Sequence, residues 1–197
     1  MQIRLTFPAA LLAASALAFG LAFGVAWAPA AAQDCPAPPE NDTIDFGGVE
    51  PLEIVTASGR YAFEVQIADT REELSRGLMF RPEIAPTFGM LFKYDAPQQV
   101  SFYMRNTCAS LDIIFVKADG RIDSLVRHAV PFSERSLPSA GRVTGVLEIA
   151  AGRAADLDVH PGDLIVHPFF GAAPESGGGS GAVEPGDGPE EEGAEAP

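Results

Sequence analysis

Residues 100–116 read VSFYMRNTCASLDIIFV, two apolar segments separated by a short polar insert. The second segment, residues 111–116, is rich in β-branched and aromatic side chains, which favour strands. The insert holds Arg105, Asn106 and Thr107, whose guanidinium, amide and hydroxyl groups can bind polar ligands. The stretch therefore predicts two strands joined by a polar turn, and this turn is the best candidate for chemistry.

Short apolar segments separated by Gly, Pro and Asp fill the region from residue 50 to residue 171. We expect a hairpin over residues 52–67 and further strands at 89–93, 100–104, 111–116, 121–130, 143–149 and 164–167. Two short helices are expected at 71–76 and 153–157. Many short strands with few helices predict a mostly β fold, a single compact β-sandwich or small barrel with one or two short helices.

The first 32 residues have the features of a secretory signal peptide. Arg4 is the only charged residue, an apolar stretch runs from about residue 7 to residue 27, and Ala30-Ala31-Ala32 offers a cleavage site. We therefore expect a periplasmic or secreted protein without stable membrane insertion after the signal is removed. The alternative is a retained anchor, because the stretch approaches the roughly 20 apolar residues that span a bilayer.

Two further segments lie outside the expected domain, which comprises residues 50–171. Residues 33–49 form a Pro/Gly-rich linker, and residues 172–197 form an acidic Gly/Pro-rich tail that we expect to be disordered. The tail accounts for half of the net charge of −14, whereas residues 50–170 contain 16 acidic and 12 basic residues. Because the basic residues are dispersed, the composition argues against nucleic-acid binding.

The two cysteines, Cys35 and Cys108, are compatible with an exported protein, where disulfides persist. A bridge between them would tie the linker to the polar insert. The alternative is a buried Cys108 and a free Cys35, because sequence alone does not show that the two Cα atoms approach each other.

The candidate ligand-binding residues surround the insert. They are Arg81, Tyr103, Arg105, Asn106, Thr107 and Asp112. A guanidinium suits carboxylate, phosphate or sugar oxygens, and an aromatic ring beside it can form an apolar platform. The structural alternative is that Asn106 and Thr107 build the turn while Arg105 pairs with Asp112.

The sequence contains no Gly-x-Ser-x-Gly, His-Glu-x-x-His, Cys-x-x-Cys or phosphate-loop motif. The catalytic residues are therefore unassigned, and no cofactor or metal is expected. A hydrolase or lyase of an unrecognised type remains an alternative, with Asp112 or His128 as the general base and Arg105 stabilising negative charge.

Five segments together carry a family resemblance: GLMFR (77–81), GMLF (89–92), FYMRNT (102–107), LDI (111–113) and VLE (146–148) followed by Ala151-Gly152. In this order they resemble the domain of unknown function 192 family, over about residues 50–168. The resemblance implies a compact, mostly β domain, often exported, with no assigned activity. It also marks Arg81, Met104, Arg105, Asn106, Thr107, Asp112 and Glu148 as family positions without giving them roles.

Two positions depart from the family pattern. Tyr103 replaces the usual Trp, and Ala109-Ser110 stands where a Pro commonly precedes the Leu-Asp pair. An aromatic platform is kept in the first case, and in the second we expect the loss of Pro to loosen the insert.

These observations favour an exported, non-catalytic binding or accessory domain. Its expected partner is a small polar or anionic ligand, a glycan or another component of the cell envelope, bound at the Arg105-Asn106-Thr107 insert. A structural module for protein interaction, in which the polar cluster is an internal network, is the third hypothesis.

Overall fold

A computed structural model describes residues 34–171 of the 197-residue chain. The predicted signal peptide and the predicted acidic tail therefore lie outside the described residues. Within the described part, no helix is long and apolar enough to cross a membrane.

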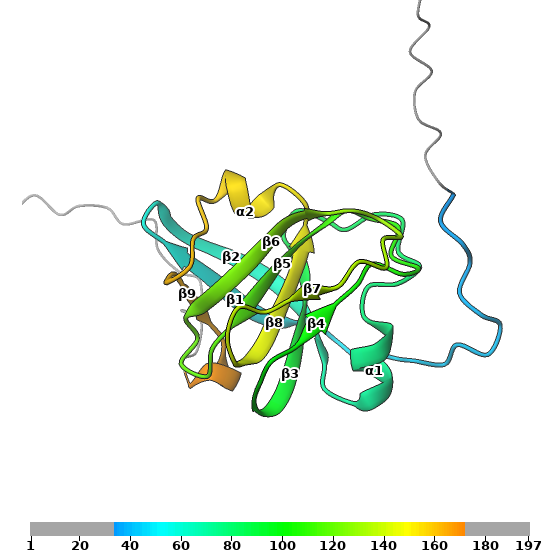
Figure 1. Ribbon diagram of the computed structural model, residues 1–197, viewed down its shortest axis with the longest axis horizontal. Coiled ribbons are helices and arrows are strands. Elements are labelled where there is room, and N and C mark those ends of the chain that lie inside the picture. The colour runs from blue at the N-terminus through cyan, green and yellow to red at the C-terminus, as the bar shows by residue number, and fades with distance from the viewer. Residues whose placement is uncertain (1–33, 172–197) are drawn as a thin grey trace, which may run out of the picture. The chain divides into compact units, whose positions relative to one another are not determined.

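Nine strands and two short α-helices make up the domain (Figure 1). In chain order they are β1 (Glu50–Thr56), β2 (Gly59–Ala68), α1 (Arg71–Arg76), β3 (Phe88–Gln98), β4 (Ser101–Phe102), β5 (Leu111–Val116), β6 (Ile122–Ala129), β7 (Leu137–Pro138), β8 (Val143–Ala150), α2 (Arg153–Asp156) and β9 (Leu164–Val166), followed by a 3-10 turn at Pro168–Phe170. The prediction of a mostly β domain with short helices is confirmed.

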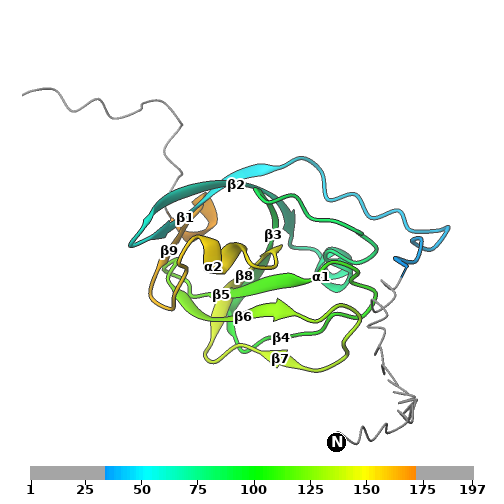
Figure 2. The same cartoon turned by 90° about the horizontal axis from the view of Figure 1, so that it is seen from above.

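Seven strands form one curled sheet in the order β6-β5-β8-β3-β2-β1-β9 (Figures 1 and 2). Only β2 and β3 pair in parallel, because α1 carries the chain across between them. The two edge strands meet at one end, where the Ile165 amide donates to the Gly120 carbonyl and the Ile122 amide donates to the Asp163 carbonyl, both at 2.8 Å. The sheet is thus a half-barrel that is closed at this end.

The curled sheet has an apolar core on each of its two faces. The inner core gathers residues such as Leu52, Phe63 and Ile114 inside the curl. The outer core includes Phe92 and Phe115, and β4 and β7 form a separate two-stranded ribbon that packs there through Phe102 and Leu137. Because β5 and β8 are buried on both faces, their sequences are almost continuously apolar.

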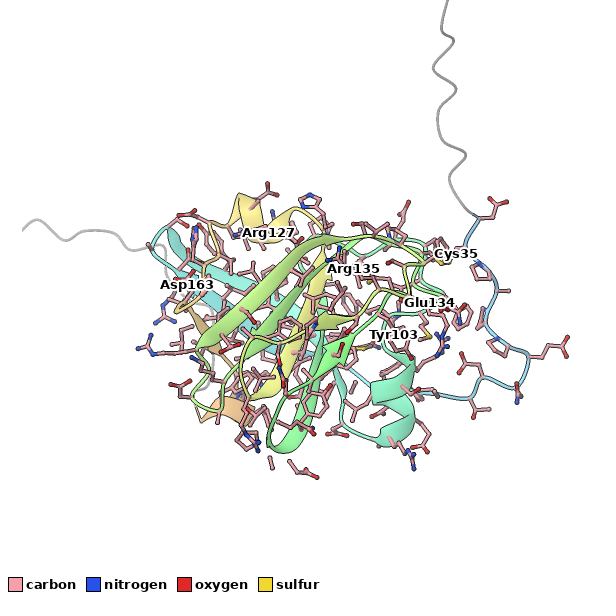
Figure 3. All side chains as sticks on the ribbon, in the orientation of Figure 1. Cys35, Tyr103, Arg127, Glu134, Arg135 and Asp163 are labelled. Atoms are coloured by element: carbon pink, nitrogen blue, oxygen red, sulfur yellow. A yellow bond between two sulfur atoms is a disulfide. The ribbon has the colours of Figure 1, made fainter. Side chains whose placement is uncertain are left out.

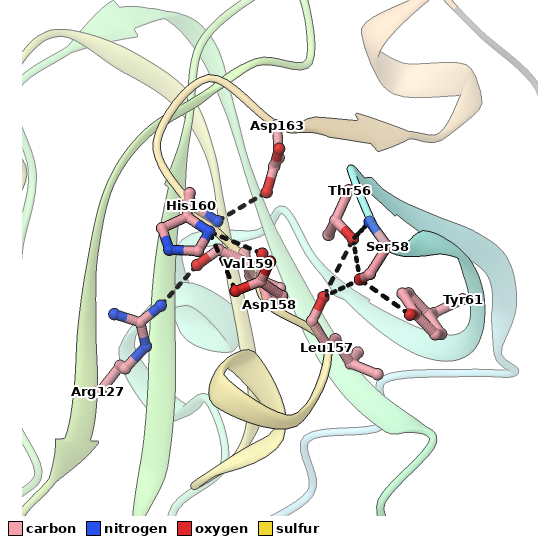
Figure 4. Close-up of polar contacts among 9 residues, drawn as sticks. All are labelled: Thr56, Ser58, Tyr61, Arg127, Leu157, Asp158, Val159, His160 and Asp163. Carbon is pink, nitrogen blue, oxygen red and sulfur yellow. Dashed lines mark hydrogen bonds and ion pairs between the residues drawn. The ribbon is translucent and has the colours of Figure 1, made fainter.

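The chain after α2 fastens the closed end of the half-barrel (Figure 4). The hydroxyls of Thr56 and Ser58 both donate to the Leu157 carbonyl at 3.0 Å. Arg127 donates to the Val159 carbonyl at 2.6 Å from β6. These bonds connect the β1–β2 turn and β6 to the segment that leads into β9.

Local sequence patterns explain several element boundaries. Helix α1 begins at a capping box, in which Glu73 and Thr70 each bond the other's backbone amide. The Asp119-Gly120 pair turns β5 into β6 as predicted. The largest differences from the predicted boundaries are that β3 extends to Gln98 and that the strand expected over residues 100–104 is only Ser101–Phe102.

Residues 34–49, which we call the strap, run extended past α1 to β1 (Figures 1 and 3). Cys35 forms a disulfide with Cys108, with the two Cα atoms 5.4 Å apart. Asp42 forms an ion pair with Arg76 of α1, and Phe46 packs against the outer core. The strap therefore belongs to the packed structure of the domain.

Candidate functional site

A cavity of about 90 Å³ lies on the outer face of the sheet, the face that carries the outer core. We call it the inner cavity to distinguish it from the wider groove beside it, and the name does not refer to the inner core. Its walls are the α1 end and the following turn (residues 74–79), Phe92 and Tyr94 of β3, residues 101–103, Thr107 and Glu148 of β8. The walls thus combine helix, sheet and polar insert, and most of the lining side chains are apolar or aromatic.

Glu148 is the acidic residue of this cavity. Its neighbours Leu147 and Ile149 belong to the inner core, so alternation along β8 turns Glu148 toward the outer face. Only 5% of the residue is exposed, and within residues 34–171 its carboxyl has no hydrogen bond or ion pair. Burial raises the pKa of Glu148 to about 8.

Tyr94 lines the inner cavity from β3. Burial, together with the nearby Glu148, raises the pKa of Tyr94 to about 12. Its phenol therefore stays protonated at neutral pH and can donate a hydrogen bond.

A second and wider depression, the outer groove, lies beside the inner cavity and has a volume of about 560 Å³. Both cavities are lined by Ser75, Arg76, Met79 and Tyr103, so these residues form their common border. The remaining residues of the groove are Ile44, Arg71, Glu72, Arg105 and Asn106. Of the three guanidinium groups that line the groove, that of Arg76 is paired with Asp42, so Arg71 and Arg105 beside the carboxylate of Glu72 make the groove basic.

Arg105 and Tyr103 form one unit at the edge of the groove. The Arg105 guanidinium lies 4.9 Å from the centre of the Tyr103 ring and donates to its hydroxyl at 3.1 Å. Tyr103 is 38% exposed, although it is a large aromatic residue. In the described part of the chain, neither Arg105 nor Arg71 has a carboxylate partner, so both charges are available to a ligand.

Arg76 has a different environment. Its Nε donates to Asp42 Oδ2 at 2.8 Å, its Nη1 donates to the Met79 carbonyl at 2.7 Å, and its guanidinium stacks on Phe80 at 4.3 Å. The hydrogen bond from Arg76 also lowers the pKa of Asp42. Arg76 therefore fastens the strap and the turn, and its charge is already balanced.

Asn106 and Thr107 shape the polar insert. Asn106 has a positive φ of 57°, and its carbonyl accepts from the Phe80 amide at 2.8 Å. Thr107 is buried, and its amide donates to the Met104 carbonyl at 3.0 Å. Both residues build the turn, as the structural alternative proposed, and they also line the outer groove and the inner cavity respectively.

Asp112 is placed differently from the predicted cluster. It is fully buried, and its carboxylate accepts from the amides of His128 (2.9 Å) and Ala154 (2.8 Å). It lines neither cavity and forms no ion pair with Arg105, so the proposed pairing of these two residues is wrong. The physical reason is strand alternation, which turns Asp112 toward α2 while Leu111 and Ile113 enter the outer core.

Arg81 and His128 also lie outside both cavities. Arg81 donates to the Gln66 side chain at 2.6 Å and lies near the rings of Phe46 and Phe88, where burial lowers its pKa. His128 is exposed on β6. Neither residue joins Arg105 at a common cleft, so the geometry does not assemble the base that the hydrolase alternative needs.

Glu148 was not among the ligand-binding residues predicted from the sequence. The signal that could have revealed it is an acidic residue inside VTGVLEIA, a run that is otherwise apolar or uncharged. Such a strand is buried on both faces, and acidic residues are rarely fully buried without a partner. A buried ionisable group in a cavity is a candidate functional residue.

Residues 53–167 match the model of the DUF192 family, described as "Uncharacterized ACR". The chain belongs to the DUF192 family. No curated protein matches it. This membership agrees with the resemblance seen in the sequence, and it assigns no activity.

Two crystal structures are similar to this DUF192 chain. One is a protein of unknown function from Novosphingobium aromaticivorans DSM 12444, with 39% identity, a TM-score of 0.59, and coverage of 70% of this chain and 96% of that one. The other is described as a putative transcription regulator from Sinorhizobium meliloti 1021, with 34% identity, a TM-score of 0.61, and coverage of 64% and 98% respectively. Each of the two alignments covers almost the whole length of the similar protein.

Proposed function

We propose that this DUF192 protein is an exported, non-catalytic binding domain whose outer groove binds the anionic group of a small polar ligand. The observation that carries the proposal is the position of Arg71 and Arg105 in one groove without carboxylate partners among residues 34–171. A guanidinium binds carboxylate and phosphate oxygens through directed, charge-assisted hydrogen bonds.

The Arg105–Tyr103 unit supports this binding role. The stacking and the hydrogen bond hold the guanidinium in one orientation, so less side-chain entropy is lost when a ligand binds. The exposed Tyr103 ring supplies an apolar surface on which a sugar ring could pack. An acidic glycan of the cell envelope therefore suits the groove as well as a small anion does.

A role in binding nucleic acid is less well supported. The similar protein from Sinorhizobium meliloti is described as a putative transcription regulator. Residues 50–170 of this chain, however, contain 16 acidic and 12 basic residues, and the groove accounts for only three of the latter. Phosphate-backbone binding needs a larger cluster of positive charge.

The test compares the thermal midpoint of the purified protein with and without inorganic phosphate, short carboxylates and uronic-acid oligosaccharides. A ligand that binds only the folded state raises the midpoint. We expect a shift that is lost in Arg105→Ala and kept in Arg135→Ala, an exposed arginine that lines neither cavity (Figure 3). No shift across the panel, or equal shifts in both variants, would favour a protein-interaction module.

Export is tested separately by expression of the full chain in a Gram-negative host. We expect the periplasmic fraction to contain a protein whose mass corresponds to a start at Gln33. Recovery of the uncleaved chain from the membrane fraction would instead establish the retained-anchor alternative.

A further inference from the structure

We infer that the inner cavity is a binding site for a small primary ammonium group, with Glu148 as its counter-ion. The first observation is that this carboxyl has no partner in the described part of the chain. Glu148 is 5% exposed and has no hydrogen bond or ion pair with any residue of the described part. Buried polar groups in folded proteins are normally hydrogen-bonded, so a carboxyl that lines a cavity and has no protein partner points to a ligand as its partner.

The other walls of the cavity favour a cation over an anion. Phe92, Tyr94, Phe102 and Tyr103 line it, and aromatic rings attract ammonium groups through their negative faces. The hydroxyls of Thr107 and Ser101 can accept hydrogen bonds from an ammonium group. The cavity thus offers one acid, hydroxyl acceptors and aromatic surface.

The positive charge at the border does not oppose this assignment. Arg76 on α1 is the basic residue that lines the cavity, and it is bonded to Asp42 and to the Met79 carbonyl. The other ionisable groups in the walls are Tyr94 on β3 and Tyr103 after β4. The raised pKa of Tyr94 keeps its phenol neutral at physiological pH.

The size of the cavity limits the group that can enter. Its volume is about 90 Å³, whereas an apolar cavity of about 150 Å³ holds benzene. The inner cavity therefore suits an ammonium group with a few carbon atoms, such as the end of an aliphatic amine. A bulky quaternary ammonium is too large.

The border shared by the two cavities extends the inference to a whole ligand. An ammonium group near Glu148 and an anionic group near Arg105 would be separated by the width of this border, which is formed by Ser75, Arg76, Met79 and Tyr103. The matching ligand class is a small zwitterion with separated charges, such as an amino acid or an amino sugar acid. This extension rests on the proposed function of the outer groove, whereas the amine site rests on Glu148.

The probe for the amine site is n-propylamine, which has no anionic group, and the matched neutral probe is propionamide. Isothermal titration calorimetry measures both against the full chain and against Glu148→Gln. The control is Glu134→Gln, an exposed acid that lines neither cavity (Figure 3). We expect propylamine to bind the wild type and Glu134→Gln equally, and to bind Glu148→Gln about 10- to 100-fold more weakly, because a charge-assisted hydrogen bond is lost.

Proton release gives a readout that a purely structural role of Glu148 would not produce. The buried carboxyl is protonated at pH 7, so formation of the ion pair transfers one proton from Glu148 to the buffer. Titrations in two buffers of different ionisation enthalpy should therefore show nearly one proton released per amine bound, and none in Glu148→Gln. Affinity should rise as the pH increases toward 8.

Two results would overturn the amine site: equal binding of propylamine to the wild type and Glu148→Gln, or binding of propionamide in preference to propylamine. Arg105→Ala separates this inference from the proposed function. Propylamine should bind Arg105→Ala normally, whereas anions should not. If the wild type bound no anion, the proposed function and the zwitterionic ligand would both be refuted. The amine site would not be affected by that result.

Discussion

Gly77 lies against the carboxyl of Glu148. A Cβ atom at Gly77 would be 3.9 Å from Glu148 Oε2 and only 2.9 Å from Cζ of Phe92. The glycine also has a positive φ of 46° as it ends α1. The turn after α1 therefore approaches the sheet closely enough to form one wall of the inner cavity, and this approach depends on the absence of a side chain.

Replacing Gly77 with Ala should destabilise the domain by about 1–3 kcal/mol, because the added methyl group overlaps the Phe92 ring and the backbone is strained. Urea unfolding measures the change. The matched control is Gly47→Ala, which has a similar positive φ of 66° but no atom within 4 Å. If the two variants lost equal stability, backbone strain alone would explain the effect and the close contact would be unimportant.

Glu148 should make the domain less stable as the pH rises. The pKa is 4.5 for the ordinary group and about 8 in the folded protein, so the folded state holds one more proton than the unfolded state between these values. Stability is therefore highest near and below pH 4.5 and is lost as the pH rises through about 8, with a slope of up to about 1.4 kcal/mol per pH unit.

Urea unfolding of the wild type and Glu148→Gln at pH 5, 7 and 9 tests this dependence. The difference between the two proteins isolates the titration of Glu148, and Glu134→Gln provides the control for an exposed acid. We expect the wild type to lose stability relative to Glu148→Gln from pH 5 to pH 9. A constant difference would mean that Glu148 titrates normally in the folded protein.

Asp112→Asn should weaken the fold without affecting ligand binding. The carboxylate accepts from two backbone amides, and an amide side chain has only one oxygen for them. Loss of one charge-assisted bond to a buried amide should cost about 2 kcal/mol. Thermal unfolding checks the effect on stability, and the anion titrations check the effect on binding. If Asp112→Asn were folded but bound anions more weakly than the wild type, Asp112 would be part of the ligand site.

The disulfide should stabilise both the strap and the outer groove. Cys35 and Cys108 are 73 residues apart, and a cross-link over a loop of this length is worth about 4 kcal/mol by loop-entropy arguments. Replacing both cysteines with serine should lower the free energy of unfolding by about 4 kcal/mol. It should also weaken binding in the outer groove, because Ile44 of the strap lines this groove. Reductant should have the same effect on the wild type and no effect on the double variant.

The sequence predicted the elements that local chemistry determines. The capping residues Thr70 and Glu73 set the start of α1, and Asp119-Gly120 set the β5–β6 hairpin. The ribbon strand Leu137–Pro138 was missed, since two residues carry no periodicity and its pairing with β4 depends on tertiary packing. Strand order could not be predicted for the same reason, because register and order come from contacts between distant segments.

The candidate site was predicted only in part. Tyr103, Arg105, Asn106 and Thr107 do line the two cavities. Asp112 was misplaced because its neighbours in the sequence suggested proximity, whereas strand alternation sends it to the opposite face. The contributions of Arg71 and Glu148 depend on how α1 and the turn after it lie beside the sheet, which is a contact between distant segments of the chain.

The closure of the half-barrel has a consequence for the order in which the chain can fold. Strand β9, near the end of the domain, supplies the pairing for β1 through Ile54 and Ile165, and it also meets Gly120. A ribosome-bound chain that has not yet released β9 leaves β1 as an open sheet edge. Folding is therefore completed only after the last strand has emerged, and until then the unpaired edge of β1 is open to pairing with other chains.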